Sequence, residues 1–135
     1  MDVMVFMGGA NGANDIAKYD SKLALRHISN FLNTNSNTNI VVVSVPHRYD
    51  LIQSSCVNRE IRSFNRKLSK LAKAHQRVSF FKMSKHRDFF TTHCQHLNSL
   101  GKKKLAKQLV LLTYNILQHE MLHPIPLVGI LIKAN

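Results

Sequence analysis

Two short segments of the chain contain asparagine and histidine side chains, which are residue types that can take part in acyl-transfer reactions. Gly12-Ala13-Asn14-Asp15 follows an apolar segment, and Thr92-His93-Cys94-Gln95-His96-Leu97-Asn98 precedes an amphipathic one. An asparagine amide can donate to a developing oxyanion, and one such donor is worth about 3 kcal/mol. A histidine can act as the general base for a nucleophile. Gly-Ala-Asn occurs twice in succession, so that Asn11 and Asn14 stand in the same local sequence.

The elements that must position these residues alternate between strand and helix. The pattern predicts strands at 3–7, 40–45 and 78–81, and helices at 15–32, 57–75 and 97–117. The 40–45 segment is β-branched and apolar on both faces, as in a parallel strand covered by helices on both sides. This alternation indicates an α/β fold with a parallel sheet, which places sites beyond the carboxyl ends of its strands. The remaining residues, 118–135, contain Pro124 and Pro126 and are predicted to form an irregular tail.

Each predicted helix carries an apolar stripe at helical spacing, which indicates a face packed on the core. The stripe residues are Leu25, Ile28, Phe31 and Leu32 in the first helix, Val57, Ile61, Phe64, Leu68 and Leu71 in the second, and Leu105, Leu109, Leu112 and Ile116 in the third.

The two motifs resemble the last two blocks of the SGNH (GDSL-type) hydrolase family. The resemblance covers residues 1–117 and includes the closing stretch His96-Leu97-Asn98 followed by Gly101-Lys102. It implies a three-layer α/β/α, flavodoxin-like sheet and ester hydrolysis. Asn14 and His96 are the candidate catalytic residues that it implies, Asn14 in the oxyanion hole, with Asn11 as its rival, and His96 as base. The chain is also similar to SGNH-like domains of insect proteins, among them the RNA-binding OSK domain.

The chain departs from the family pattern at the positions that matter most. The block that carries the family's serine nucleophile, and the strand before it, have no counterpart here. His93 stands where the family has the aspartate three residues before the base. Asp88 could supply a carboxylate only if its loop folded back. We therefore expect an esterase-like domain that lacks its N-terminal strand and is inactive as this chain, with an ester as substrate only for a longer, active form.

The charge balance suggests a second function of another class. The chain has 135 residues with 19 Lys and Arg against 7 Asp and Glu, a net charge of +12, which favours anionic partners. Basic residues lie on the predicted 57–75 helix about 180° from its apolar stripe, and a further lysine group lies on the next helix. A non-catalytic RNA-binding domain is the alternative, and a plain solvated surface is the simplest explanation of the charge. The candidate nucleic-acid-binding residues are Arg59, Arg62, Arg66, Lys70, Lys73, Lys103 and Lys107.

Metal and redox chemistry are not favoured by the sequence. His86, His93, Cys94 and His96 are crowded together but match no common zinc-ligand spacing, so we expect neither a metal nor another cofactor. Cys56 and Cys94 are too sparse for a disulfide scaffold and are interpreted as thiols of an intracellular, cytoplasmic or nuclear protein, with a single disulfide as the alternative. No apolar run is long enough for a transmembrane segment.

Overall fold

The computed structural model describes residues 2–7, 21–83, 86–91 and 96–122. Strands and helices alternate along the chain, as predicted. The elements are β1 (Val3–Phe6), α1 (Ser21–Thr34), β2 (Asn39–Val43), α2 (Cys56–Lys73), β3 (Val78–Phe81), the 3-10 turn η2 (Arg87–Phe89) and α3 (Ser99–Leu122). The strands form one three-stranded sheet in the order β1-β2-β3, and both pairings are parallel. The predicted α/β class with a parallel sheet is therefore confirmed.

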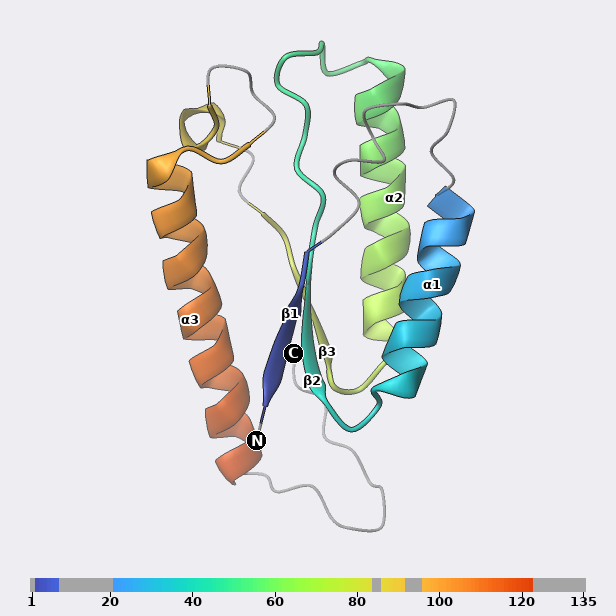
Figure 1. Cartoon of the computed structure of the whole chain (residues 1–135), viewed down its shortest axis with the longest axis vertical. Helices are drawn as coiled ribbons and strands as arrows, with labels where there is room; N and C mark the ends of the chain where they lie inside the picture. Colours follow the sequence, from blue (N-terminus) through green and yellow to red (C-terminus); the bar gives the residue numbers. More distant parts are fainter. Residues whose placement is uncertain (1, 8–20, 84–85, 92–95, 123–135) are drawn as a thin grey trace.

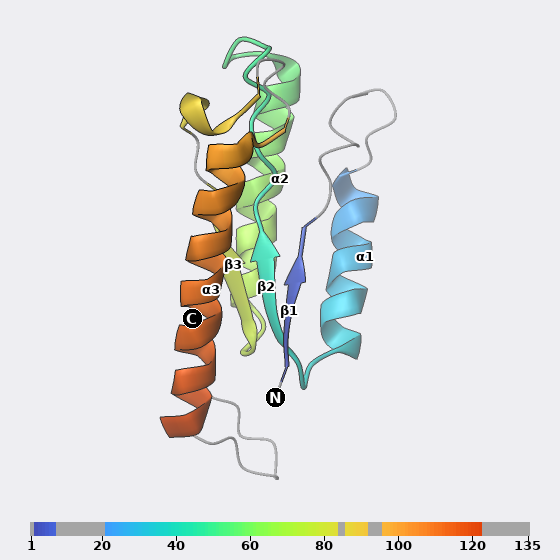
Figure 2. The ribbon, with the colours of Figure 1, turned by 60° about the vertical axis from the view of Figure 1, so that its left-hand side comes forward.

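Helices cover both faces of this sheet (Figures 1 and 2). α1 and α2 lie on one face, as expected when successive neighbouring strands are joined by crossovers of the same hand. α3 lies on the opposite face. The central strand β2 is therefore buried along its whole length, which explains why its sequence is apolar on both faces.

Alternate residues of the strands supply two separate cores. The core under α1 and α2 contains Ile28, Leu32, Ile40, Val42, Val45, Ile61, Phe64, Leu68, Ala72 and Val78. The core under α3 contains Val41, Val43, Met83, Phe90 and Ile116, with Leu105, Leu109 and Leu112 packed against it. The apolar stripes predicted for the three helices thus face the sheet.

Several element boundaries differ from those predicted. β2 ends at Val43 rather than at residue 45, because the backbone groups of Val45 bond to the Asn65 side chain instead of to a strand. α1 continues to Thr34, while residues 15–20 of that predicted helix lie outside the described part of the chain. α3 continues to Leu122, so the predicted boundary at residue 118 falls inside a helix. Its residues 118–122 precede Pro124 and are compatible with helix.

The start of α3 is built from the closing stretch noted in the sequence. The Asn98 side chain accepts a hydrogen bond from the Gly101 N–H at 2.8 Å, and its amide donates to the carbonyls of Asp88 and Phe90. A Cβ at Gly101 would lie only 2.2 Å from the Phe89 carbonyl oxygen. The fold therefore explains both residues: Asn98 caps the helix, and Gly101 leaves room for the η2 backbone to approach it.

Substituting Gly101→Ala should destabilise the protein, although alanine is intrinsically the better helix former. The added methyl group meets backbone rather than a flexible side chain, so we expect a loss of about 2 kcal/mol in the free energy of unfolding. Urea denaturation would measure it, with the exposed Lys103→Ala as a control that stays within about 0.5 kcal/mol. A gain in stability for Gly101→Ala would contradict the close approach.

Candidate functional site

Two asparagines of α2 hold the chain segment that leaves β2. Asn65 accepts from the Val45 N–H and donates to the Val45 carbonyl, each at 2.8 Å. Asn58 does the same for Arg48, at 2.9 Å for both bonds, and also donates to Ile52. Each asparagine side chain thus makes, with one residue of the loop, the pair of backbone hydrogen bonds that a neighbouring strand would otherwise make. The loop is fixed against α2 at two points, which determines where His47 and its neighbours lie.

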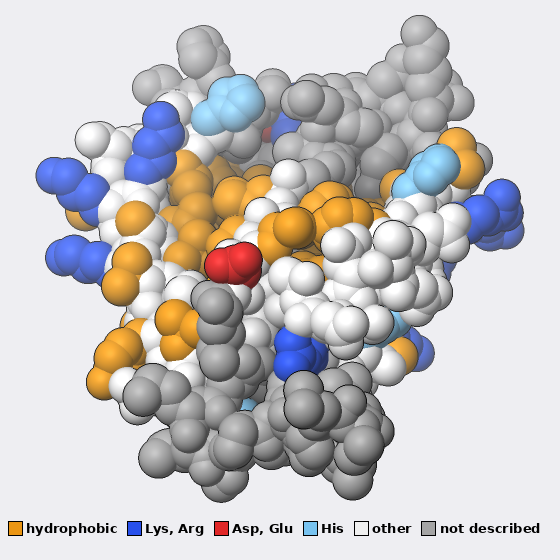
Figure 3. All heavy atoms as spheres, turned by 60° about the horizontal axis from the view of Figure 1, so that its bottom comes forward, with side chains coloured by type: hydrophobic (Ala, Val, Ile, Leu, Met, Phe, Trp, Pro, Cys, Tyr) orange, Lys and Arg blue, Asp and Glu red, His pale blue; other side chains and the backbone are white. Residues whose placement is uncertain are grey.

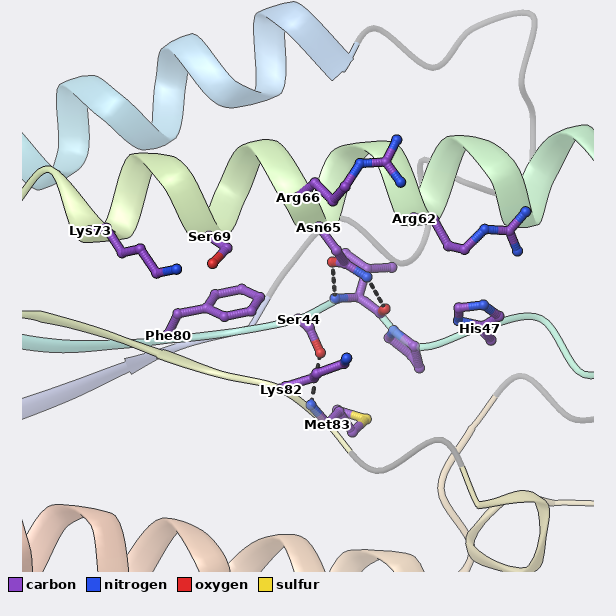
Figure 4. A pocket seen from close by; sticks show the side chains of 12 residues that line it. Ser44, His47, Arg62, Asn65, Arg66, Ser69, Lys73, Phe80, Lys82 and Met83 are labelled. Carbon is purple, nitrogen blue, oxygen red and sulfur yellow. Dashed lines mark hydrogen bonds between the residues drawn. The ribbon is translucent and has the colours of Figure 1, made fainter. Parts of the chain in front are cut away.

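A cavity of about 500 Å³ opens beside this segment, at the carboxyl ends of β2 and β3. Figure 4 shows one wall made by side chains of α2 and the other made by the sheet and the residues that follow β3. The lining residues are Ser44, Val45, Pro46, His47, Arg62, Asn65, Arg66, Ser69, Lys73, Phe80, Lys82 and Met83. A site at strand carboxyl ends is where an α/β sheet is expected to have one.

The charged side chains that line the cavity are basic, and no Asp or Glu is among them. Arg66, Lys73 and Lys82 are exposed and make no ion pair within the described part of the chain. Arg62 donates to the Gln53 carbonyl at 2.8 Å. Asp50, the carboxylate of the loop after β2, is bound by Arg48, and this hydrogen bond raises the pKa of the guanidinium. The cavity is therefore a region of positive potential suited to an anion.

The deeper part of the cavity is less charged and is held in place by hydrogen bonds. The Ser44 hydroxyl accepts from the Met83 N–H at 2.8 Å, which fixes the segment after β3 to β2. Phe80 lies between this floor and α2, half-buried against the core of that helix. A ligand in the cavity would therefore meet an aromatic ring and small polar groups inside, and cations near the opening.

The structure divides the candidate nucleic-acid-binding residues into two groups. Those on α2 include the cavity residues, while Arg59 and Lys70 are exposed elsewhere on the helix. Lys103 and Lys107 are exposed on α3, which packs on the opposite face of the sheet. The two groups do not form one continuous surface. Sequence analysis did not anticipate that α2 shares a site with Phe80 and Lys82, because their proximity depends on how α2 packs on β3.

Sequence analysis also missed Asn58 and Asn65. Both occur on the buried side of α2, and Asn58 is only 1% exposed. The available signal was a polar residue recurring after two helical turns among apolar ones. Such residues are retained in a core when they satisfy a specific buried group.

The candidate catalytic residues are only partly described by the structure. His96 is exposed, beside an isolated bridge between Phe90 and Leu97, and its carbonyl accepts from Thr91 at 2.8 Å. The Asp88 carboxylate lies 3.5 Å from Nδ1 of the exposed His86 side chain. Asn14, its rival Asn11, and His93 lie outside the described residues, so the geometry of a catalytic group around His96 is not tested.

Three further expectations can be compared with the described residues. Among them, no group of three or more His, Cys, Asp and Glu side chains gathers as metal ligands would; His93 and Cys94 lie outside that part. Cys56 is an exposed thiol at the start of α2. None of the described helices has the length and apolar character needed to cross a membrane.

Comparison with protein families, characterised proteins and solved structures gives no match for this chain. Its function must therefore be inferred from the residues and geometry of the site.

Tyr49 packs against the core under α3, in an environment that disfavours its ionised form. Its ring packs on Phe90 at a centroid distance of 4.8 Å, and its hydroxyl is buried without a hydrogen-bond partner among the described residues. Burial raises the pKa of the Tyr49 phenol, and the positive charge of Arg87 opposes this effect more weakly. The unfolded chain therefore loses the Tyr49 proton at a lower pH than the folded protein does.

Tyr49→Phe should change both stability and its pH dependence. Removing the orphaned hydroxyl should raise the free energy of unfolding by about 1 kcal/mol at neutral pH. In the parent protein, the stability linked to Tyr49 is complete below pH about 10 and is lost as pH rises toward the higher folded pKa. Denaturation at several pH values should show a shallower alkaline decline in Tyr49→Phe. Tyr114→Phe, at a site 59% exposed, is the control; equal stability of Tyr49→Phe and parent would contradict the prediction.

Proposed function

We propose that this chain is an SGNH-like domain that does not hydrolyse esters in this form and that binds RNA through the basic side of α2. The observation that carries the binding function is the lining of the cavity, which includes Arg62, Arg66 and Lys73 of α2 and Lys82 after β3 but no carboxylate. Like charges gathered in this way repel one another, and an anionic ligand relieves the repulsion.

The arrangement of the sheet supports the SGNH-like part of the proposal. A flavodoxin-like sheet has the strand order 2-1-3-4-5, and the sequential order β1-β2-β3 corresponds to its last three strands. In that arrangement a further strand would pair with β1. Consistent with this, Met4, Val5 and Met7 are exposed apolar residues on or beside β1. Figure 3 shows hydrophobic side chains gathered on this face of the molecule.

The surroundings of His96 support the absence of ester hydrolysis. A histidine base needs a nucleophile within hydrogen-bond reach and a group that orients its ring. The sequence has His93 at the family's aspartate position, and the Asp88 carboxylate lies beside His86, 3.5 Å from its Nδ1. The hydrogen bonds of Asn98 and the close approach at Gly101 account for the rest of the closing motif without catalysis.

RNA binding should depend on the α2 cations. The triple variant Arg62→Glu, Arg66→Glu, Lys70→Glu should bind single-stranded RNA at least about tenfold more weakly. A cation that neutralises a phosphate releases a counterion from the RNA, and this release contributes to the affinity; the variant loses that contribution at three positions. The slope of log affinity against log salt should become shallower by about one for each such phosphate. Fluorescence anisotropy of a labelled oligonucleotide, measured over a salt series, gives both quantities.

The matched control reverses the same number of charges on α3, with Lys102→Glu, Lys103→Glu and Lys107→Glu. These residues are exposed on the helix that covers the other face of the sheet. We expect the control to lose clearly less affinity than the α2 variant. Equal losses in the two variants would mean that only net charge matters and would reject α2 as the interface.

Ester turnover should be absent from this chain. Hydrolysis of p-nitrophenyl acetate should proceed at the same rate with the parent protein and with His96→Ala, because a histidine, His93, and not a carboxylate stands three residues before His96. Absorbance of released p-nitrophenolate measures the rate, with serum albumin at equal concentration as a control for non-specific hydrolysis. A turnover rate that is higher in the parent and lost in His96→Ala would contradict the proposal.

A further inference from the structure

We infer that the cavity between α2 and β3 binds one nucleotide unit, with its base against Phe80 and its phosphate toward Arg62 and Arg66. The inference deepens the proposed RNA-binding function and rests on it. A volume of about 500 Å³ lies within the range of about 300 to 1,000 Å³ that small-molecule sites occupy. The cavity is therefore large enough for a base, a ribose and a phosphate.

Phe80 supplies the surface on which a base can stack. It belongs to β3, and the alternation of that strand directs Val78 and Phe80 to the α2 side. Figure 4 shows the Phe80 ring in the hollow, below Ser69 and Lys73 of α2. Its core neighbours keep the ring in place, so little conformational freedom is lost on binding. Stacking on an aromatic ring suits every base, because each has a π face.

The cations are placed where the phosphate of such a nucleotide would lie. Arg62 and Arg66 are one helical turn apart on α2, line the cavity and stand on the His47 side of Phe80; in Figure 4 the Arg66 side chain points away from the sheet. A guanidinium can bind a phosphate through two parallel N–H donors. The amine of Lys82 approaches from the segment after β3, so positive charge lies on both walls.

This geometry favours single-stranded over double-stranded RNA. A base can reach Phe80 only after it has left the stack, which costs a few kcal/mol in a duplex and much less in a single strand. A duplex can still contact the exposed α2 cations through its backbone. A preference for single-stranded RNA would therefore indicate binding in the cavity. Salt-dependent binding without such a preference would indicate binding to the exposed α2 cations alone.

The test compares Phe80→Leu with the parent protein on single-stranded oligoadenylate, on the corresponding duplex and on free AMP. Phe80→Leu keeps an apolar side chain but removes the ring, so we expect single-strand affinity to fall about tenfold while duplex affinity stays unchanged. AMP should compete with the single strand for the parent protein. Phe31→Leu, which alters a half-buried ring of the same core on α1, is the matched control and should bind like the parent.

A second variant keeps the test decisive if Phe80→Leu unfolds. Ser69→Leu fills the hollow from a partly exposed position on α2 and should reduce single-strand binding by a similar factor, with unfolding curves as the check on folding. Unchanged single-strand affinity in a folded Phe80→Leu or Ser69→Leu variant overturns the cavity site but leaves RNA binding by α2 intact. Binding of AMP without binding of RNA supports the nucleotide site and overturns the proposed RNA function. Binding of neither overturns both.

Discussion

The hydrogen bonds from Asn58 and Asn65 to the backbone after β2 are the constraint on which the candidate site depends. The chain must leave the sheet at Ser44 and pass through a buried region, where unpaired N–H and C=O groups are costly. The two side chains satisfy those groups at Val45 and Arg48. Because both come from the buried side of α2, the same bonds also fix the helix relative to the sheet.

The position of α2 then determines the charge of the cavity. With Asn58 and Asn65 bound to the segment after β2, Arg62 lies half-exposed on the same side of α2, while Arg66 is exposed; both line the cavity. Lys82 reaches the same place from the other side, since the Ser44 hydroxyl holds the backbone of Met83. The positive potential of the cavity thus follows from the hydrogen bonds that fix α2 and the segment after β3. An anion bound in the cavity is expected to stabilise the folded protein.

Sequence patterns were sufficient for the elements and their buried faces, because periodicity reports directly on burial. The 40–45 run predicted a strand covered on both faces, and β2 is such a strand. Patterns did not reveal the cavity, since Arg62, Phe80 and Lys82 become neighbours only through the packing of α2 on β3. In the closing motif, a sequence pattern suggested a function where a structural role is enough. Asn98 and Gly101 match a hydrolase pattern, yet Asn98 caps α3 and Gly101 allows α3 to pack closely on η2. Asn14 lies outside the described residues, and its assigned role comes from the sequence alone.

The two parts of the proposed function depend on opposite edges of the sheet. Ester hydrolysis would need a further strand with a nucleophile beside β1, the edge where Met4 and Val5 are exposed. The basic cavity instead uses β3, the residues after it and α2, and no described residue of β1 lines it. A strand added at the β1 edge would leave the residues that line the cavity unchanged. The proposed RNA binding at α2 and the proposed absence of ester hydrolysis are therefore independent of each other.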